Sequence, residues 1–448
     1  MPFLCSECGY RSIKWFGRCP SCGAWESFSE DRSSEDESVE AVSWLGEELR
    51  SIDCVGLDEI PRLPTGMDEF DRLLGGGVIP GGVILFGGEP GIGKSTLLLQ
   101  IAELIARSRG NVLYVSGEES EGQVKLRASR IGVENERLYV LSEQSLSRIQ
   151  AAVERLSPVV LIVDSIQTTV NERVAGEAGS LRQLREASSE LIRTAKSRRM
   201  ATFLVGHITK DGAFAGPKSV EHLVDAAIYL EGSRGEDIRI LRSVKNRFGA
   251  TNEVVVFRMT AEGLTEIDDP SRFFLEGMEK EPTPGTTIVP ILEGTRPILV
   301  EMQALVLPTG GYGVPQRRCT GLDVNRVLLL LAVLEKHAGI QVSGADVYLS
   351  LAGGLETRER GTDMGVLASI CSSLRNRPLP ARTAMVGEVG LSGEVRAVRR
   401  LGERVREAEK MGMERVIVPG GSELPRGHAI DVIGVERVGE ALEKIGLG

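Results

Sequence analysis

A short glycine-rich segment carries the clearest chemistry in this sequence. It fits the pattern G-x-x-x-x-G-K-[ST], and its residues are Gly88, Glu89, Pro90, Gly91, Ile92, Gly93, Lys94 and Ser95. An apolar, strand-like run precedes it, and an apolar-rich helical segment continues from Thr96. Glycines let backbone N–H groups converge on phosphate oxygens, and a helix N-terminus adds positive potential. We therefore expect residues 88–96 to bind a nucleotide, with Lys94 at the β- and γ-phosphates and the Ser95 hydroxyl on Mg²⁺.

Three acidic residues follow two other predicted strands. Asp164 ends the apolar run 159–163, and Glu118 and Glu119 follow the run 112–116. In open α/β folds the ligand lies at the carboxyl ends of the strands. We expect Asp164 to face Mg²⁺ through water, and one of the two glutamates, Glu118 by preference, to activate the attacking water. Simpler roles, a helix cap for Asp164 and a solvated pair for the glutamates, fit the same positions.

Four cysteines near the start of the chain have the spacing of metal ligands. Cys5 and Cys8 form one C-x-x-C pair, and Cys19 and Cys22 form another. Two such pairs complete a tetrahedron of thiolates around Zn²⁺ and leave no open position for catalysis. Disulfides are the alternative, but a cytosolic context disfavours them. The spacing does not separate a folding role from a contact module for DNA or a neighbouring subunit.

Composition and charge exclude some classes of protein. The chain has 448 residues, of which 42% are apolar and 26% charged, so wholesale disorder is excluded and about three domains are expected. The net charge is -10, but many acidic residues crowd between Glu30 and Glu48, so basic surfaces and nucleic-acid binding are not excluded. The sequence contains no apolar run of membrane-helix length and no signal-peptide pattern. We expect a soluble, cytoplasmic protein with no membrane partner.

Short apolar runs alternate with longer amphipathic segments over residues 63–268. The candidate strands are residues 83–86, 112–116, 159–163, 202–206, 226–230, 239–244 and 253–259. Helix-length segments separate the first four, which predicts an α/β fold with a mainly parallel sheet. The later strands follow one another closely and predict an antiparallel extension at one edge. A second α/β region begins near residue 287, with predicted strands at 298–306, 383–387 and 415–419 and a helix at 323–338.

These pieces, in this order, resemble the RecA-like ATPases, and the whole chain resembles a family of bacterial DNA-repair ATPases. The most specific match is the KNRFG motif of that family, formed here by Lys245, Asn246, Arg247, Phe248 and Gly249. The resemblance implies five parts: a four-cysteine zinc ribbon (1–28), an acidic linker (29–60), a RecA-like ATPase domain (61–269), a second linker (270–286) and a catalytically inactive Lon-protease-like domain (287–448).

The family resemblance also implies an activity. It is that of a DNA-dependent ATPase of homologous recombination and DNA repair, which uses ATP, Mg²⁺ and Zn²⁺. Such a protein would assemble as a hexameric ring, translocate on single-stranded DNA and act on branched DNA. It would drive branch migration alongside RecA recombinase.

The KNRFG motif lies at the end of a predicted strand. The positive charges of the motif would also fit a simple basic turn that ends at Gly249. The resemblance implies that Lys245, as a point charge, and Arg247, as a planar fork, reach the γ-phosphate bound by an adjacent subunit and also contact DNA. Hydrolysis would then require an oligomer.

His207 ends another predicted strand and precedes a glycine-rich segment that carries Lys210 and Lys218. A histidine at a strand end can be purely structural. In RecA-like proteins a polar residue at this position senses the γ-phosphate and signals to a DNA-binding loop. Glycines allow close approach to a phosphate backbone and lysines release its counterions. We expect His207 to contact nucleotide, and Lys210 and Lys218 to bind DNA in the 209–222 loop.

Two segments of the C-terminal region, residues 360–365 and 387–395, resemble the part of Lon proteases that holds the catalytic Ser–Lys dyad. Asp363 stands at the serine position and Arg404 at the lysine position. Arginine stays charged and aspartate forms no acyl-enzyme, so peptidase activity is not expected. An ATP-driven peptidase and a RecA-like switch that does not move DNA remain the alternative functions. Stimulation of ATP turnover by single-stranded DNA would separate a motor from a switch.

Overall fold

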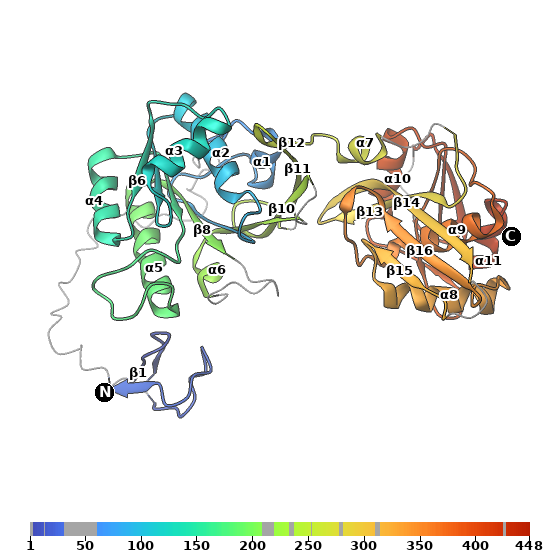
Figure 1. Cartoon of the computed structure of the whole chain (residues 1–448), viewed down its shortest axis with the longest axis horizontal. Helices are drawn as coiled ribbons and strands as arrows, with labels where there is room; N and C mark the ends of the chain where they lie inside the picture. Colours follow the sequence, from blue (N-terminus) through green and yellow to red (C-terminus); the bar gives the residue numbers. More distant parts are fainter. Residues whose placement is uncertain are drawn as a thin grey trace, which may run out of the picture. The chain divides into compact units, whose positions relative to one another are not determined.

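The computed structural model describes residues 3–12, 14–30, 61–207, 219–232, 237–251, 253–276, 281–309, 314–423 and 427–448. The chain divides into two compact units, Met1–Glu266 and Ile267–Gly448, and Figure 1 shows the elements of each. Most of the expected linker 29–60 lies outside the described residues. The five-part division stays a prediction. Within the expected second linker, residues 270–275 form a helix of the second unit.

The first element of unit 1 is a small antiparallel sheet. Its strands, in spatial order, are β2 (Arg11–Ser12), β1 (Phe3–Cys5) and β3 (Phe28–Glu30). Phe28 packs against three buried cysteines, Cys5, Cys8 and Cys19. The core of this ribbon is thus built largely from thiol groups.

A nine-stranded sheet forms the centre of unit 1 (Figure 1). In spatial order its strands are β12 (Gly263–Glu266), β11 (Val254–Thr260), β10 (Ile238–Asn246), β9 (Ala226–Glu231), β4 (Val83–Gly88), β8 (Ala201–His207), β7 (Val160–Asp164), β5 (Val112–Ser116) and β6 (Leu138–Ser142). The strands from β9 to β6 pair in parallel, and β10, β11 and β12 extend the β9 edge in antiparallel order. This confirms the predicted mainly parallel α/β fold and its antiparallel edge.

Helices cover both faces of this sheet. The helices of unit 1 are α1 (Asp68–Leu73), α2 (Lys94–Ser108), α3 (Glu121–Arg130), α4 (Leu146–Leu156), α5 (Leu181–Arg198) and α6 (Ser219–Leu223). One buried core joins the sheet to α1, α2 and α3, and a second joins its other face to α4, α5 and α6. Alternate residues of β5 divide between these cores, with Tyr114 on the α2 side and Leu113 on the α5 side. This alternation decides which side chains of a strand can reach the glycine-rich segment.

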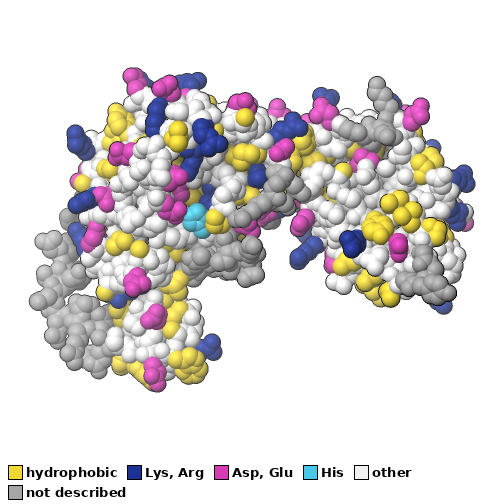
Figure 2. Space-filling view, viewed as in Figure 1, with side chains coloured by type: hydrophobic (Ala, Val, Ile, Leu, Met, Phe, Trp, Pro, Cys, Tyr) yellow, Lys and Arg dark blue, Asp and Glu magenta, His cyan; other side chains and the backbone are white. Residues whose placement is uncertain are grey.

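Unit 2 is built on a mixed sheet of seven strands. In spatial order these are β15 (Arg317–Thr320), β16 (Ala345–Leu351), β14 (Arg296–Pro308), β13 (Thr286–Glu293), β17 (Thr383–Met385), β20 (Arg415–Pro419) and β21 (Asp431–Val435), with a separate pair β18 (Glu388–Val389) and β19 (Val395–Arg396). Its helices are α7 (Pro270–Leu275), α8 (Val324–Ala338), α9 (Asp363–Arg375), α10 (Leu401–Lys410) and α11 (Val438–Lys444). Figure 2 shows hydrophobic side chains gathered on the visible surface of this unit. Separately, Leu305 and Leu307 of β14 are exposed hydrophobic residues.

Within the part of the chain that the structure describes, every helix is too short or too polar to cross a lipid bilayer.

Candidate nucleotide site and its surroundings

The glycine-rich segment lies between β4 and α2, as the sequence predicts. Gly93 adopts φ 115° at the N-cap of α2 and supplies no side chain to cap it. The first N–H groups of α2 therefore have no side-chain acceptor, and such a helix end attracts phosphate. A Cβ at Gly91 would meet no atom within 4 Å. The segment thus has the open, amide-lined form that nucleotide phosphates require.

The Lys94 ammonium is held within this segment. Its Nζ donates to the carbonyl oxygens of Gly88 and Glu89, each at 2.9 Å, and lies 3.1 Å from Nδ1 of His207. Burial lowers the pKa of Lys94 to about 8, although the carboxylates of Asp164 and Glu118 oppose the shift. At neutral pH the group remains a cation placed where phosphate would bind.

Ser95 and Asp164 lie next to each other. The Ser95 hydroxyl donates to Oδ2 of Asp164 at 2.6 Å, and the Tyr114 hydroxyl donates to the same oxygen at 2.5 Å. Asp164 is the last residue of β7, so it stands at the carboxyl edge of the sheet. A hydroxyl and a carboxylate are the oxygen ligands that Mg²⁺ prefers. The donor set therefore fits the magnesium site expected for Ser95 and Asp164.

The two candidate glutamates face different partners. Oε1 of Glu118 accepts a hydrogen bond from Ser165 at 2.9 Å and lies 3.2 Å from Nε2 of His207. Glu119 forms an ion pair with Arg127 of α3. Because the Lys94 ammonium can only donate to Nδ1 of His207, the His207 proton lies on Nε2 and is donated to Glu118. Glu118 thus belongs to the Lys94–His207 network, whereas Glu119 is committed to α3.

The KNRFG motif and the glycine-rich segment lie at opposite ends of the strands of the same sheet. Asn246, at the end of β10, pairs with Ala226 at the amino end of β9, whereas Gly88 of the glycine-rich segment pairs with Leu230 near the carboxyl end of β9. At about 3.3 Å per residue, the length of β9 separates the motif from the phosphate site by roughly 15 Å. Within one subunit, Lys245 and Arg247 therefore lie at the other end of the strands from Lys94.

The two cations of the motif have different surroundings. The Lys245 ammonium donates to the backbone carbonyls of Glu221, His222 and Val224 at 2.8, 3.0 and 2.7 Å, at the end of α6. Arg247 is half-exposed and its guanidinium lies 3.3 Å from the buried carboxylate of Asp225. Lys245 is thus occupied at the end of α6, whereas Arg247 projects further into solvent.

The expected DNA loop is only partly described. Lys210 and Lys218 lie outside the described residues. His207 immediately precedes this segment at the end of β8, and α6 follows it. The described residues on either side of this segment are thus His207 of the nucleotide network and the helix α6, whose end Lys245 contacts.

The four cysteines converge as predicted. Their sulfur atoms all lie within 4.8 Å of one another. Sγ of Cys5 lies 3.7 Å from Sγ of Cys22, and Sγ of Cys8 lies 3.6 Å from Sγ of Cys19. A disulfide bond is about 2.05 Å long, whereas the edge of a tetrahedron of sulfurs at about 2.3 Å from a zinc ion is about 3.8 Å. The arrangement fits a four-thiolate metal site and not disulfides.

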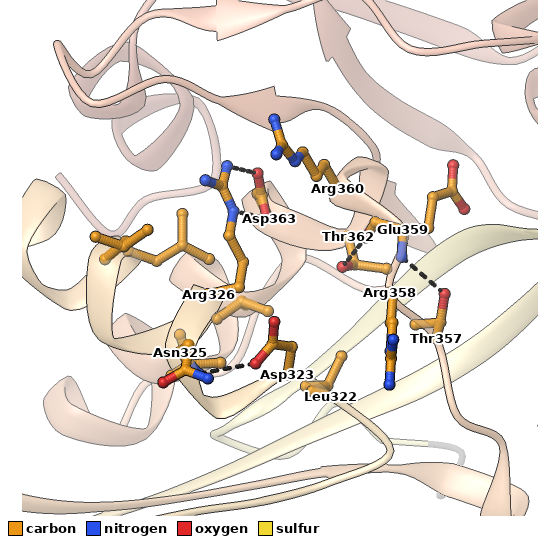
Figure 3. Close-up of a pocket in the computed structure, with 14 residues that line it drawn as sticks. Leu322, Asp323, Asn325, Arg326, Thr357, Arg358, Glu359, Arg360, Thr362 and Asp363 are labelled. Carbon is orange, nitrogen blue, oxygen red and sulfur yellow. Dashed lines mark hydrogen bonds and ion pairs between the residues drawn. The ribbon is translucent and has the colours of Figure 1, made fainter. Parts of the chain in front are cut away.

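In unit 2, Asp363 and Arg404 are both buried in ion pairs. Asp363 pairs with Arg326 and accepts the backbone N–H of Val389 at 2.9 Å. Figure 3 shows Arg326 reaching toward Asp363 in a pocket of about 290 Å³. Arg404 is fully buried and pairs with Glu359, which lines the same pocket. Neither side chain offers a nucleophile or a neutral amine at this place.

The sequence reasoning missed three residues that contact the site. The Tyr114 hydroxyl binds Asp164, the Ser165 hydroxyl binds Glu118, and Nε of Arg239 donates to the carbonyl of Ile92 at 3.1 Å. A tyrosine inside an otherwise apolar strand signals a buried hydroxyl that needs a partner. No comparable sequence signal marks Ser165 or Arg239, because their contacts depend on how the strands are ordered in the sheet.

Three family models match parts of the chain. Residues 62–213 match the AAA domain, residues 3–30 the rubredoxin metal binding domain, and residues 353–442 the Lon protease (S16) C-terminal proteolytic domain. A KaiC-like protein from Pyrococcus horikoshii is similar to part of the structure, with a TM-score of 0.40 and 19% identity over 46% of this chain and 99% of that chain.

Full-length relatives are much more similar. The DNA repair protein RadA of Bacillus subtilis is 46% identical over 98% of this chain and 97% of the relative. The RadA proteins of Streptococcus pyogenes serotype M6 and Listeria monocytogenes are 46% and 45% identical, each over 99% of this chain, and 98% and 97% of those relatives are covered. The similarity thus extends over nearly the whole chain, including the regions that hold the phosphate site and the Lon-like unit. This chain belongs to the family of the DNA repair protein RadA.

Proposed function

We propose that this protein is a DNA-stimulated ATPase of recombination and repair that moves along single-stranded DNA as a hexameric ring. ATP would bind at residues 88–96 of one subunit, and Arg247 of the adjacent subunit would approach its γ-phosphate. The ring would migrate branched recombination intermediates together with RecA recombinase in the cytoplasm. The RadA family membership supports the DNA-repair context of this proposal.

The separation of Lys94 from Arg247 within one subunit is the observation that carries the proposal. The two residues stand at opposite ends of the strands of one sheet, so a single subunit cannot bring Arg247 to its own nucleotide. A head-to-tail interface joins different surfaces of neighbouring copies, and such interfaces form rings when the rotation between copies closes. An arginine supplied across the interface stabilises transition-state charge in other nucleotide hydrolases.

Within each subunit the described residues would divide the work at the nucleotide. Lys94 and the N–H groups of α2 would bind the phosphates, and Ser95 and Asp164 would hold Mg²⁺, which supplies charge neutralisation when bound. Glu118 would orient the attacking water. His207 bridges Lys94 and Glu118, so binding or loss of the γ-phosphate would alter the contacts of the residue that precedes the 209–222 loop. Lys210 and Lys218 in this loop would contact DNA.

Cys5, Cys8, Cys19 and Cys22 would bind one Zn²⁺ that folds the ribbon. The Lon-like unit would have no peptidase activity, because Asp363 and Arg404 are committed to ion pairs with Arg326 and Glu359. We assign this unit a part in ring assembly and DNA contact. ATP-dependent degradation of casein by the purified protein would contradict the assignment.

ATP turnover with and without single-stranded DNA tests the proposal. A motor should hydrolyse ATP several-fold faster with single-stranded DNA, and it should extend the heteroduplex joints that RecA has begun. A switch that does not move DNA would bind ATP without either response. Turnover that is the same with and without DNA would contradict the proposed function.

A further inference from the structure

A buried hydroxyl contacts the carboxylate that we assign to Mg²⁺. Tyr114 lies in the middle of β5 and is 1% exposed. Its hydroxyl donates to Oδ2 of Asp164 at 2.5 Å, the same oxygen that accepts the Ser95 hydroxyl at 2.6 Å. Two donors therefore converge on one oxygen of one carboxylate.

The strand order explains why Tyr114 reaches Asp164. β5 and β7 are paired in parallel with Tyr114 opposite Ile162 and Ser116 opposite Asp164. Tyr114 and Ile162 both face the core shared with α2, and Asp164, two residues after Ile162, lies on the same face. The tyrosine ring therefore spans the two-residue offset along the sheet and delivers its hydroxyl at the carboxyl edge.

Packing alone does not require a hydroxyl at this position. A phenylalanine would fill the same core, but a buried hydroxyl is costly unless it finds a partner. A tyrosine hydroxyl keeps its proton near neutral pH, so the group is a hydrogen-bond donor to the Asp164 carboxylate. Among the described residues the hydroxyl has one acceptor, Asp164.

The contact has a consequence for metal binding. When the Ser95 hydroxyl ligates Mg²⁺ through an oxygen lone pair, its O–H can still donate to Asp164. Tyr114 is the second protein donor to the same oxygen, and it contributes to fixing the Asp164 carboxylate without ligating the metal itself. Donors of this kind to a metal-binding carboxylate typically change metal affinity by about 10–100-fold when they are removed.

We infer that Tyr114 is a positioning residue for the metal half of the nucleotide site, acting through Oδ2 of Asp164. The inference rests on the proposed assignment of Asp164 to Mg²⁺. It concerns the binding of the metal–nucleotide complex and not the binding of free nucleotide, because the hydrogen bonds of Lys94, which would bind phosphate, go to Gly88, Glu89 and His207 and not to Tyr114. Tyr114→Phe should therefore weaken the binding of the metal–nucleotide complex and leave the binding of free nucleotide unchanged.

Mn²⁺ serves as the probe, because electron paramagnetic resonance measures free Mn²⁺ directly without any turnover. In the presence of ADP, Tyr114→Phe should raise the dissociation constant of Mn²⁺ about tenfold. Binding of a fluorescent ADP in EDTA should stay within twofold of the unmodified protein. Tyr139→Phe, on the exposed edge strand β6, is the matched control and should change neither quantity. Unchanged Mn²⁺ affinity in Tyr114→Phe, or an equal loss of ADP binding in EDTA, would overturn the inference.

Asp164→Asn distinguishes failure of the inference from failure of the site. If Asp164→Asn weakens Mn²⁺ binding and Tyr114→Phe does not, only the role of Tyr114 is wrong. If Asp164→Asn has no effect, the assigned metal site itself is wrong. Should Tyr114→Phe be too unstable to assay, the melting temperature of the double variant Tyr114→Phe/Asp164→Asn tests the inference. A melting temperature above that of Tyr114→Phe alone supports action through Asp164, and one that is no higher contradicts it.

Discussion

Nζ of Lys94 lies 3.1 Å from Nδ1 of His207. The same ammonium also donates to two carbonyl oxygens of the glycine-rich segment. A phosphate that binds Lys94 has to compete with these contacts. Engagement of ATP by Lys94 would therefore displace at least one of the three contacts, and His207 is the partner that leads directly into the segment expected to contact DNA.

The affinity for nucleotide should fall at alkaline pH. Burial places the pKa of Lys94 at about 8, and the charged or titratable groups facing it are Asp164, Glu118 and His207. Phosphate requires the protonated ammonium, which is present below this pKa and must be regained above it. Each further pH unit above about 8 should weaken binding about tenfold, as measured with fluorescent ADP between pH 7.5 and 9.5.

Lys94→Arg is the control for this pH profile, because arginine stays charged over the whole range. Its affinity should be nearly independent of pH, whatever its absolute value. Constant affinity of the unmodified protein up to pH 9.5 would contradict the prediction.

Glu118→Gln should separate binding from hydrolysis. Because Glu118 lies in the network of His207 and Ser165, loss of its carboxylate should lower the turnover number about 100-fold with little change in ATP affinity. Glu119→Gln is the matched variant, since Glu119 pairs with Arg127, and it should keep most of the turnover. Steady-state ATPase assays measure the turnover number of each variant. A large loss in Glu119→Gln with little loss in Glu118→Gln would assign the water-activating role to Glu119 instead.

Lys245→Ala and Arg247→Ala should fail in different ways. Loss of the Lys245 hydrogen bonds to three carbonyls at the end of α6 should cost about 2 kcal/mol of unfolding free energy. Arg247→Ala should lose some stability, because its half-exposed guanidinium pairs with the buried Asp225 carboxylate, but its main defect should be the loss of DNA-stimulated turnover and branch migration. Urea denaturation and ATPase assays separate the two effects. Full stimulation in Arg247→Ala would exclude a role across the subunit interface.

Much of unit 1 could be predicted from the sequence. A glycine-rich segment of this pattern between an apolar strand and a helix is typical of phosphate binding, and Asp164 at the end of an apolar run follows from the same α/β pattern. β6 was missed because Tyr139 and its neighbours on this edge strand are only partly buried, so the strand lacks a continuous apolar run. β12 is a short antiparallel edge strand of four residues with little pattern to detect.

The contacts between strands could not be predicted. Tyr114 meets Asp164, and Glu118 meets His207, only because β5, β7 and β8 are neighbours in the sheet, an order that local sequence does not encode. The position of Lys245 is similar. Its expected contact with nucleotide or DNA stays a prediction, and only the fold shows that its ammonium also reaches the carbonyl groups that end α6.

Removal of Zn²⁺ should affect the four-cysteine ribbon alone. One Zn²⁺ per chain is expected by elemental analysis, and Cys8→Ser or Cys19→Ser should abolish it, because either change breaks the tetrahedron. Trp15 and Trp25 lie beside the cysteines and are exposed, so chelation should change tryptophan fluorescence. Cys319→Ser, in unit 2, should leave both the metal content and the fluorescence unchanged. A full complement of metal in Cys19→Ser would refute the four-thiolate site.

Complementation between two inactive variants tests the subunit interface most directly. Lys94→Ala lacks the phosphate contact and keeps Arg247, whereas Arg247→Ala keeps Lys94. Each should be inactive alone with single-stranded DNA. If the variants co-assemble at random in equal amounts, about a quarter of the interfaces combine an intact Lys94 with an intact Arg247. The account predicts that DNA-stimulated ATPase returns to about a quarter of the normal rate in the mixture, and a mixture that stays inactive while forming mixed oligomers would contradict it.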